Sequence, residues 1–513
     1  MLRRYLALPL LLPLLPLIVL GAVAFPRRAH HSSTTPATSA TDNLAAHPVN
    51  APSSTASSAS GSPSVRDHGA VGDGITDDTV AIQRAIAAGA TYFPRGSYRL
   101  TAPLEINLHE LGFRALRGDG DARLIMAAAG PALRLRGTHG GTADPPTFKP
   151  HVWQRERMPI VTRLEIVGEH PEADGIEASG TMQLTISQVN IRQARHAIHL
   201  IERNRNLLIE ACHLYDNRGC GVFYDQVNLH QSNISDCHIS YNRGGGVVVR
   251  GGDVRNVQIS GCDIEANMSP TSPPTANVLF DSTGGSMAEA TIVGCTIQHE
   301  MKSPDSANIR VLGRGQVTRQ EQVLPVDCGH ITIANNVLSD VQYNIDLNHT
   351  RGITITGNTL WQGYAANLRL AHCSQVVIGS NIMERNPLYG YTREASNRVE
   401  LRDCQDCTIH GLQLHDVRDA PAAFTATRCR RLLVTGCSFL DCAPAAILWE
   451  EVHDSQLTNC LINDDLPRDP NSSSVPLIVR GKCERNRIDI ASGDTPPSAQ
   501  GSLPNHSDSP LKP

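Results

Sequence analysis

The sequence of 513 residues predicts an all-β protein, a parallel β-helix, on two observations: a short repeat and a recurrent residue type at its corners. Segments that begin at Ile209, Ile234 and Ile259 follow one pattern at intervals of 25 residues. Each repeat holds three short apolar segments and none long enough to form a helix. Such a repeat cannot bury its apolar face alone, so successive turns are expected to stack at roughly 4.8 Å and share one core.

The repeat extends in both directions from this stretch. Most steps span 22 to 25 residues, and the longer steps before Ile292, Ile333 and Ile409 are interpreted as single turns that carry insertions. The apolar residues that open the turns are predicted to stack on one another in the order Ile186, Ile209, Ile234, Ile259, Ile292, Ile333, Ile355, Ile378, Ile409, Val434 and Leu457.

A two-residue kink occupied by Cys or Asn follows the first segment of each turn. Asn tolerates the left-handed backbone conformation that a sharp corner requires, and stacked Asn side chains can hydrogen-bond along a ladder. Cys suits the same place as a small buried hydrophobe, so most of the 14 cysteines are predicted to be free thiols. The predicted ladder contains Cys212, Cys237, Cys262, Cys295, Asn336, Asn358, Asn381, Cys437 and Cys460.

The β-helix domain is predicted over residues 65–490, with three other segments around it. In residues 1–28, Arg3 and Arg4 precede an uncharged run over residues 5–25, which predicts either a cleaved signal peptide or a retained membrane anchor. Both alternatives place the domain outside the cytoplasm, secreted or anchored. Residues 29–64 are rich in Ser, Thr and Pro and predict a disordered linker, and residues 491–513 predict a disordered tail.

Residues 65–104 predict a cap for the N-terminal end of the β-helix. A Gly-rich turn precedes a helix with its N-cap at Thr76 or Asp77. The Asp77-Asp78 pair is interpreted as part of this cap and not as a catalytic pair. The helix is expected to cover the open end of the core with the apolar residues Val80, Ile82 and Ile86.

This block resembles the N-terminal signature of the pectate-lyase-like superfamily of right-handed parallel β-helices. The resemblance is specific over residues 65–104 and agrees in kind with the repeats to about residue 490. It implies a right-handed β-helix that binds or cleaves polysaccharide, and it does not choose the reaction. The ordered polygalacturonase motifs Asn-Thr-Asp, Asp-Asp, Gly-His-Gly and Arg-Ile-Lys are not present as a set, and the Arg-x-Pro-x-x-Arg pattern of calcium-dependent pectate lyases is absent.

Candidate functional residues lie on the outer face of the third strand of each turn. Alternate residues of a strand face opposite sides, so with Val222 directed inward, Phe223 and Asp225 face outward. Applied along the stack, the same register predicts one outward column of Glu177, His199, Phe223, Val248, Leu279, Arg310, Asp346, Arg369, Glu400, Phe424, Leu448 and Ile478. Beside it, a second outward column is predicted to include Asp225, Arg250, Asp281, Arg402, Ala426 and Glu450. We predict acid or base residues at Asp225, Asp281 and Asp346, and substrate-binding residues at Arg250, Arg310, Arg369, Glu400, Arg402 and His349.

Three interpretations of these charges remain open. Asp225 and Asp281 are expected two turns apart, roughly 9–10 Å, near the ~6.5–9.5 Å carboxyl separation of inverting glycoside hydrolases. Alternatively, the arginines bind a uronate carboxylate while a base removes its α-proton, the step that lyases share with epimerases. The third interpretation is an ion-pair ladder on a noncatalytic glycan-binding or cell-envelope protein.

The predicted partner is an acidic polysaccharide. The net charge of −5 argues against a nucleic-acid partner, and membrane contact is expected only through residues 5–25. No cofactor is expected, although outward carboxylates offer the oxygen ligands that calcium prefers. No metal site is predicted, because Cys404 and Cys407 form a CxxC pair without a second pair at zinc-site spacing.

Overall fold

A computed structural model describes residues 63–141, 144–319, 321–325, 328–386, 388, 394–418, 420–466 and 474–491. The predicted signal or anchor, almost all of the linker and almost all of the tail lie outside these residues. Within the described part of the chain, no helix is both long enough and apolar enough to cross a membrane.

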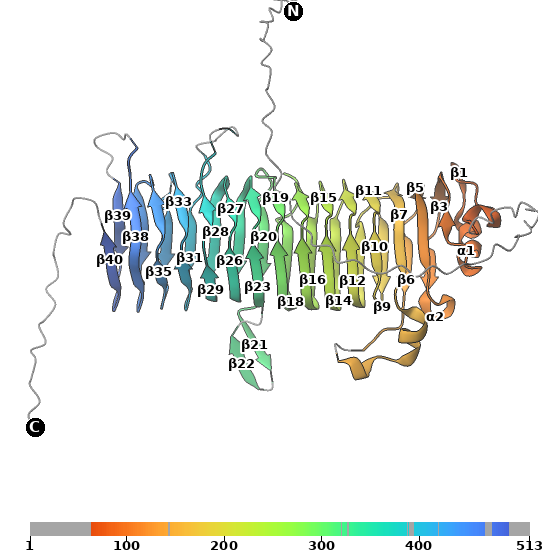
Figure 1. Ribbon diagram of the computed structural model, residues 1–513, viewed down its shortest axis with the longest axis horizontal. Coiled ribbons are helices and arrows are strands. Elements are labelled where there is room, and N and C mark those ends of the chain that lie inside the picture. The colour runs from red at the N-terminus through yellow and green to blue at the C-terminus, as the bar shows by residue number, and fades with distance from the viewer. Residues whose placement is uncertain are drawn as a thin grey trace, which may run out of the picture. The chain divides into compact units, whose positions relative to one another are not determined.

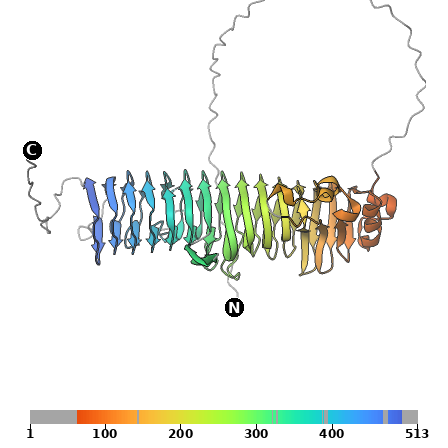
Figure 2. The ribbon, with the colours of Figure 1, turned by 90° about the horizontal axis from the view of Figure 1, so that it is seen from below.

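The described chain coils through three stacks of parallel strands, each strand pairing with strands one turn away (Figures 1 and 2). The strands that lie only in the third stack are β4 (Leu104–Asn107), β6 (Gly130–Arg136), β8 (Ala173–Ser179), β20 (Ala307–Leu312), β25 (Val341–Asn348), β28 (Gly363–Ala371), β31 (Val399–Arg402), β34 (Phe424–Thr427), β37 (Ala445–Glu450) and β39 (Val475–Arg480). The strands that lie only in the first stack are β10 (Thr185–Ser187), β23 (Gly329–Ala334), β26 (Arg351–Thr356), β29 (Ser374–Ile378), β32 (Thr408–His410) and β35 (Leu433–Thr435). The last strand, β40 (Arg487–Ala491), pairs with the first-stack part of β38 (Gln456–Asn463) and extends to its second-stack residue Leu461. The strands that lie only in the second stack are β11 (Asn190–Arg192), β13 (His213–Tyr215), β15 (His238–Ser240), β17 (Asp263–Glu265), β19 (Thr296–Gln298), β24 (Val337–Ser339), β27 (Thr359–Leu360), β30 (Ile382–Met383), β33 (Gln413–His415) and β36 (Ser438–Leu440).

Several strands bend from one stack into the next, so that the three-strand turn of the sequence is continuous in places. The strands that run from the third stack into the first stack of the following turn are β12 (Ile198–Glu210), β14 (Cys220–Ser235), β16 (Gly245–Ser260) and β18 (Ala276–Val293). The strands that span the first and second stacks are β5 (Ala115–Met126), β7 (Ile160–Gly168) and β38 (Gln456–Asn463).

The register of the first stack confirms the predicted repeat. Each opening residue from Ile186 to Leu457 pairs with its counterpart in the next turn, and the side chains are buried in one core. Ile259 pairs directly with Ile292, and Ile292 with Ile333, so the longer steps are single turns with insertions, as predicted. The insertion before Ile333 contains the antiparallel hairpin β21 (Gln316–Arg319) and β22 (Gln322–Pro325), which projects from the stacks in Figure 1.

The corners of the β-helix follow the predicted kink with one correction. The left-handed residue is the one that precedes the Cys or Asn, for example Ala211 (φ 50°), Asp236 (φ 54°) and Asn335 (φ 56°). This offset lets the Cys or Asn side chain turn into the core, where Asn336 donates to Asn358 at 3.0 Å and Asn358 to Asn381 at 2.9 Å. All 14 cysteines are free, and all but Cys483 are buried, which agrees with the prediction.

A longer asparagine ladder, which was not predicted, fixes the corner that leads into the third stack. The amide groups of its members hydrogen-bond in sequence over 2.7–2.9 Å, and every member is buried. Because each side chain also donates to a backbone carbonyl, the ladder satisfies polar groups that would otherwise be buried without partners. Its members are Asn217, Asn242, Asn267, Asn277, Asn308, Asn344 and Asn367.

Replacing Asn308 with Ala is expected to lower the free energy of unfolding by about 3 kcal/mol. Asn308 is fully buried, accepts from Asn277 and donates to Asn344 and to the carbonyl of Ser339, so its loss strands two buried acceptors. Urea denaturation measures the effect, and the exposed Asn463→Ala is the control, expected within about 0.5 kcal/mol of the wild type. Equal unfolding free energies for the two variants would show that the ladder contributes nothing.

The N-terminal cap consists of short elements that cover the first turn of the core. They are η1 (Val65–His68), β1 (Asp73–Asp77), α1 (Thr79–Ala87), β2 (Tyr92–Phe93), β3 (Gly96–Leu100) and α2 (Leu108–Leu111). The N-cap of α1 is Asp78, one residue after Asp77, the later of the two predicted N-cap positions. Of the three apolar residues expected to cover the core, Ile82 and Ile86 are buried as predicted, but Val80 is 68% exposed.

The Asp77-Asp78 pair is structural, as interpreted from the sequence. The carboxylate of Asp78 accepts from the amides of Val71 and Gly72, at 2.6 and 3.0 Å, and so holds the Gly-rich turn against the helix. Asp77 accepts from the amide and hydroxyl of Thr79.

After the cap, a segment with η2 (Pro145–Thr147) and the π-helix η3 (Val152–Glu156) interrupts the repeat. The short strand β9 (Thr181–Met182) then pairs with β12.

Candidate functional site

The third-strand face, defined here as the outward surface of the third stack, contains most of the predicted site residues. Its register agrees with the predicted column from Glu177 through His199 and Phe223 to Glu400. In the neighbouring column, Asp225 pairs in register with Arg250, and Arg250 with Asp281. The charges therefore lie on one face, in two groups separated by apolar residues such as Leu279.

The predicted register is wrong by one residue in β34. Phe424 and Ala426 are fully buried and directed into the core, while Thr425 and Thr427 pair with Glu400 and Arg402 on the outer face. The physical reason is packing: the Phe424 ring contacts the Phe439 ring edge-on in the core, with centroids 6.5 Å apart. Beyond this strand the predicted columns continue with Leu448 and Glu450.

A histidine held between two carboxylates forms the first group. Nε2 of His199 lies 3.2 Å from Oδ2 of Asp225, and its Nδ1 lies 3.5 Å from Oδ2 of Asp174, which is longer than an ordinary hydrogen bond. The imidazole stacks on the ring of Phe223 with centroids 5.4 Å apart. The side chain of Asp225 is 36% exposed and that of His199 only 11%, so Asp225 is the member of the pair that reaches solvent.

Asp174 fixes this arrangement from below the face. Its fully buried carboxylate accepts two hydrogen bonds from Arg195, at 2.9 and 2.6 Å, and one from the amide of His196. Burial alone would raise the pKa of Asp174, but Arg195 and His199 hold it far below its usual value. Asp174 is therefore a permanent anion beside His199.

The two neighbouring histidines differ in charge state. Burial lowers the pKa of His196 to about 4, so its ring is neutral and its Nδ1 accepts from the amide of Cys220. Burial also acts to lower the pKa of His199, but Asp174 and Asp225 outweigh it and raise that pKa above its usual value. His199 therefore holds a proton more readily than an ordinary histidine does.

Arg250 presents a free guanidinium beside this pair. It is exposed, lies over the Phe223 ring at 5.8 Å and has Asp225 and Asp281 as its neighbours in register. Its guanidinium forms no hydrogen bond or ion pair with any residue of the described chain. Asp281 is instead occupied by the amide and hydroxyl of Thr283, at 3.0 and 2.6 Å. An unpaired arginine in this position can bind a carboxylate of a ligand.

The second group is an arginine cluster built around Asp346. This carboxylate, 4% exposed, accepts from Nε of Arg310 at 2.7 Å and from Nε and Nη2 of Arg369, both at 2.8 Å. Arg310 is itself buried and also contacts Asp305 at 3.0 Å. Burial alone would raise the pKa of Asp346, but the two arginines lower it below its usual value. Asp346 is therefore an ionised anchor for Arg369, and Arg310 lies beneath the surface.

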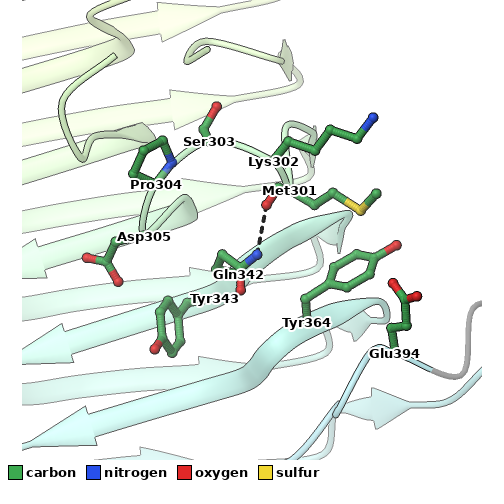
Figure 3. Close-up of a pocket in the computed structure, with 9 residues that line it drawn as sticks. All are labelled: Met301, Lys302, Ser303, Pro304, Asp305, Gln342, Tyr343, Tyr364 and Glu394. Carbon is green, nitrogen blue, oxygen red and sulfur yellow. Dashed lines mark hydrogen bonds between the residues drawn. The ribbon is translucent and has the colours of Figure 1, made fainter. Parts of the chain in front are cut away.

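Two cavities of about 630 and 490 Å³ meet at Tyr343, and we call them together the Tyr343 groove. In Figure 3, Asp305 and Tyr343 lie at one end of the larger cavity, Tyr364 and Glu394 at the other, and Gln342 donates to the carbonyl of Met301 between them. The guanidinium of Arg369 stacks on the Tyr343 ring at 3.6 Å. The smaller cavity is lined by charged side chains from consecutive turns, among them Asp346, Arg369, Arg398, Glu400 and Arg402.

The structure thus brings four predicted residues, Asp346, Arg369, Glu400 and Arg402, to one groove and places Asp225, Arg250 and Asp281 together in register. His349 lies beside the groove, where its ring stacks on His372 at 4.5 Å. Sequence reasoning did not select His199, although the predicted column contains it next to Asp225. It also did not find Tyr343, a residue of β25 whose place in the groove depends on the loop over residues 301–305.

Asp174, Glu177 and His199 are the residues of this face that could hold a metal ion, since their ligand atoms lie within 4.8 Å of one another. The oxygens of Asp174 already accept from Arg195 and from the amide of His196, so a cation would compete with the guanidinium. Glu177 accepts from Arg134 at 2.6 Å. This donor set fits an ion pair better than a metal site.

Family models match three successive parts of the chain. The model described as "Rhamnogalacturonase A/epimerase, pectate lyase-like" matches residues 62–158, and the right-handed β-helix model matches residues 160–297. The chain belongs to the pectate-lyase-like superfamily. Its β-helix is right-handed, as the resemblance implied, and a third model, that of the periplasmic copper-binding protein NosD, matches residues 288–465.

Among solved structures, this pectate-lyase-like chain is similar to tailspike protein 3 of bacteriophage CBA120, with 14% identity, a TM-score of 0.48, and coverage of 84% of this chain and 62% of that one. It is similar to the A-module of the mannuronan C-5 epimerase AlgE6 of Azotobacter vinelandii, with 15% identity, a TM-score of 0.35, and coverage of 84% and 100%. A curated relative, the non-secreted LysM effector LysM19 of Penicillium expansum, is 41% identical in an alignment of 80 residues that covers 13% of this chain and 6% of that protein.

Proposed function

We propose that this protein acts on an acidic polysaccharide bound along the third-strand face, and that it removes the proton α to a uronate carboxylate. The observation that carries the proposal is the unpaired guanidinium of Arg250 beside the Asp225–His199 pair. A bound guanidinium neutralises the carboxylate and lowers the pKa of the adjacent C–H, and a base within reach then removes the proton.

Asp225 is the group that meets the substrate, because it is more exposed than His199. With the imidazole proton on Nδ1, facing Asp174, the neutral ring leaves Nε2 free to accept the proton that Asp225 has taken. His199 is then a cation between two carboxylates, an arrangement that favours the protonated state. Elimination of the glycosidic oxygen gives the lyase reaction, and return of a proton to the opposite face gives epimerisation.

The Tyr343 groove supplies the binding subsite of this proposal. Asp346 lies four turns beyond Asp225 in the stack, roughly 19 Å at the spacing of parallel strands, a distance that an extended polysaccharide can span. Arg402 is exposed, and its guanidinium makes no hydrogen bond or ion pair with a described residue, so it is available for a second carboxylate. Asp346 and Arg310 act beneath the surface, where they position Arg369.

The family models also support an acidic polysaccharide and a place outside the cytoplasm. One is described as a rhamnogalacturonase or epimerase model and another as that of a periplasmic protein. The apolar run over residues 5–25 supports export, as a cleaved signal or as a membrane tether. Both routes deliver the domain to extracellular polysaccharides.

The proposal is tested with the full chain on polygalacturonate, alginate and neutral dextran, with and without calcium. Absorbance of unsaturated uronate and the number of reducing ends are read separately. Unsaturated product from a uronate polymer is the expected result. Reducing ends without unsaturation would instead indicate hydrolysis by Asp225 and Asp281, and binding without any product would indicate a noncatalytic glycan-binding protein.

Replacing Arg402 with Ala is expected to weaken binding of acidic oligosaccharides about tenfold, which corresponds to about 1.4 kcal/mol. The salt dependence of binding is also expected to become less steep, because one charge contact is lost. Isothermal titration at two salt concentrations measures both effects. Arg430→Ala, an exposed arginine paired with Asp454 away from the third stack, is the control and is expected to bind as the wild type. Equal weakening by both substitutions would remove the groove from the proposal.

A further inference from the structure

Outside the third-strand face, two histidines converge on one buried carboxylate next to the N-terminal cap. Nδ1 of His109, in α2, lies 3.1 Å from Oε1 of Glu156, and Nε2 of His151 lies 3.9 Å from the same oxygen. All three ligand atoms lie within 4.8 Å of one another. Tetrahedral zinc, with bonds of ~2.0–2.2 Å, places its ligand atoms about 3.3 Å apart, so small side-chain rotations suffice to surround the ion.

The π-helical turn explains why His151 and Glu156 share one side of the backbone. Residues five apart are aligned in a π-turn, and the amide of Arg157 donates to the carbonyl of Val152, five residues earlier. An α-helical turn would direct a residue at position i+5 away from residue i. The unusual winding therefore directs a His and a Glu from the inserted segment toward the His of α2.

The charge of Glu156 gives the second argument. Its side chain is fully buried, and its polar partners are His109, His151 and Thr138. No lysine or arginine of the described chain forms an ion pair with it. A buried carboxylate without a cation is unfavourable, so a divalent ion among these ligands supplies the charge that the protein lacks.

Thr138 prepares the carboxylate for this role. Its amide donates to Oε2 at 2.7 Å, which orients the group and leaves Oε1 toward the two imidazoles. Its hydroxyl contacts both Oε1 and Nε2 of His151, at 2.7 and 2.8 Å, and these contacts are exchanged for metal–ligand bonds when the ion binds. His109 and His151 are 55% and 36% exposed, so the ion has a path from solvent.

We propose that His109, His151 and Glu156 bind a divalent transition-metal ion of the zinc class, with two nitrogen ligands, one oxygen ligand and solvent in the fourth position. The ion joins α2 to the inserted segment that contains η3. Among the described residues, the contacts that hold this segment without the ion include the donation from Arg155 to the carbonyl of Glu110 and the stacking of Arg205 on Phe148. Metal binding is therefore expected to make the segment more rigid.

The test uses the full chain, treated with a chelator and titrated with Zn²⁺ by calorimetry. We expect one equivalent to bind, and His109→Ala and His151→Ala to weaken this binding at least about 100-fold. Both histidines are partly exposed, so the variants are expected to fold, which circular dichroism verifies. His238→Ala, an exposed histidine on β15, is the matched control and is expected to bind as the wild type.

Two further readouts separate the site from adventitious binding at other histidines. Zn²⁺ is expected to raise the Tm of the wild type and of His238→Ala, but not that of the two site variants. It is also expected to slow amide hydrogen exchange in residues 144–158. Failure of the wild type to bind Zn²⁺, or binding that persists unchanged in both site variants, would overturn the proposal.

Discussion

Replacing Asp225 with Asn is expected to lower the rate of unsaturated product formation by about 10²- to 10⁴-fold, while the fold remains intact. The substitution keeps the shape of the side chain but removes the base that meets the substrate. His199 retains its other carboxylate partner, Asp174, so we expect the local structure to stay the same. The initial rate of absorbance increase measures the effect, and circular dichroism verifies the fold.

Asp281→Asn is the matched comparison, because Asp281 flanks Arg250 on the opposite side and accepts only from Thr283 among the described residues. If proton abstraction is the reaction, this variant keeps most of its activity, within about tenfold of the wild type. Similar and large losses in both variants would contradict abstraction by Asp225 and would favour two carboxylates that act together in hydrolysis.

The pH dependence follows from the raised pKa of His199. The ring must be neutral to accept a proton, so kcat/KM is expected to rise with pH through a pKa above the ordinary histidine value of ~6.5. His199→Gln is expected to be slow at all pH values and to lose this rise. A profile that rises through the ordinary range of aspartate and is then flat would show that His199 takes no part.

Replacing Asp346 with Asn is expected to lower the free energy of unfolding by about 3 to 5 kcal/mol. The carboxylate is buried between Arg310 and Arg369, and its removal leaves the buried charge of Arg310 with Asp305 as its remaining carboxylate partner. Urea denaturation measures the loss. Asp403→Asn removes an equally close but solvent-exposed pair with Arg428 and is expected to cost no more than about 1 kcal/mol. Equal losses of unfolding free energy in the two variants would show that the buried ion pairs of Asp346 stabilise the fold no more than an exposed pair does.

The stabilisation by Asp346 also depends on pH in a defined direction. Because its pKa is lower in the folded state, its contribution is complete above the ordinary aspartate pKa of ~3.9 and is lost as the pH falls from there through the folded value. The difference in unfolding free energy between the wild type and Asp346→Asn is therefore expected to shrink below about pH 4.

The fold could be predicted because the repeat specifies it many times over. The opening residues from Ile186 to Leu457 recur every 22 to 25 residues in most turns, so an error in one turn would have conflicted with the turns around it. The prediction failed at Phe424. Neither alternating set of this strand, Phe424 with Ala426 or Thr425 with Thr427, carries a charge, so the sequence allows either set to face the core. Only the packing of Phe424 on Phe439, a contact between strands of different stacks, decides between the two registers.

The candidate site could be predicted only in part for a related reason. Period-2 alternation along the strands placed Asp225, Arg250 and Asp346 on one face, which required no knowledge of loops. The partners that define their chemistry come from elsewhere: Asp174 lies at the start of β8, and the part of the Tyr343 groove formed by residues 301–305 and Glu394 belongs to longer turns that depart from the repeat. Burial of Asp346 between two arginines likewise depends on side-chain packing that periodicity does not encode.

The most direct test of proton abstraction is a proton NMR spectrum of a uronate polysaccharide after incubation with the full chain in D₂O. The expected result is the appearance of vinyl proton signals from unsaturated ends, or loss of the signal of the proton α to the carboxylate as deuterium replaces it, and neither with Asp225→Asn. New reducing-end signals with the α-proton intact, or an unchanged spectrum of a polysaccharide that the folded protein binds, would contradict the proposal.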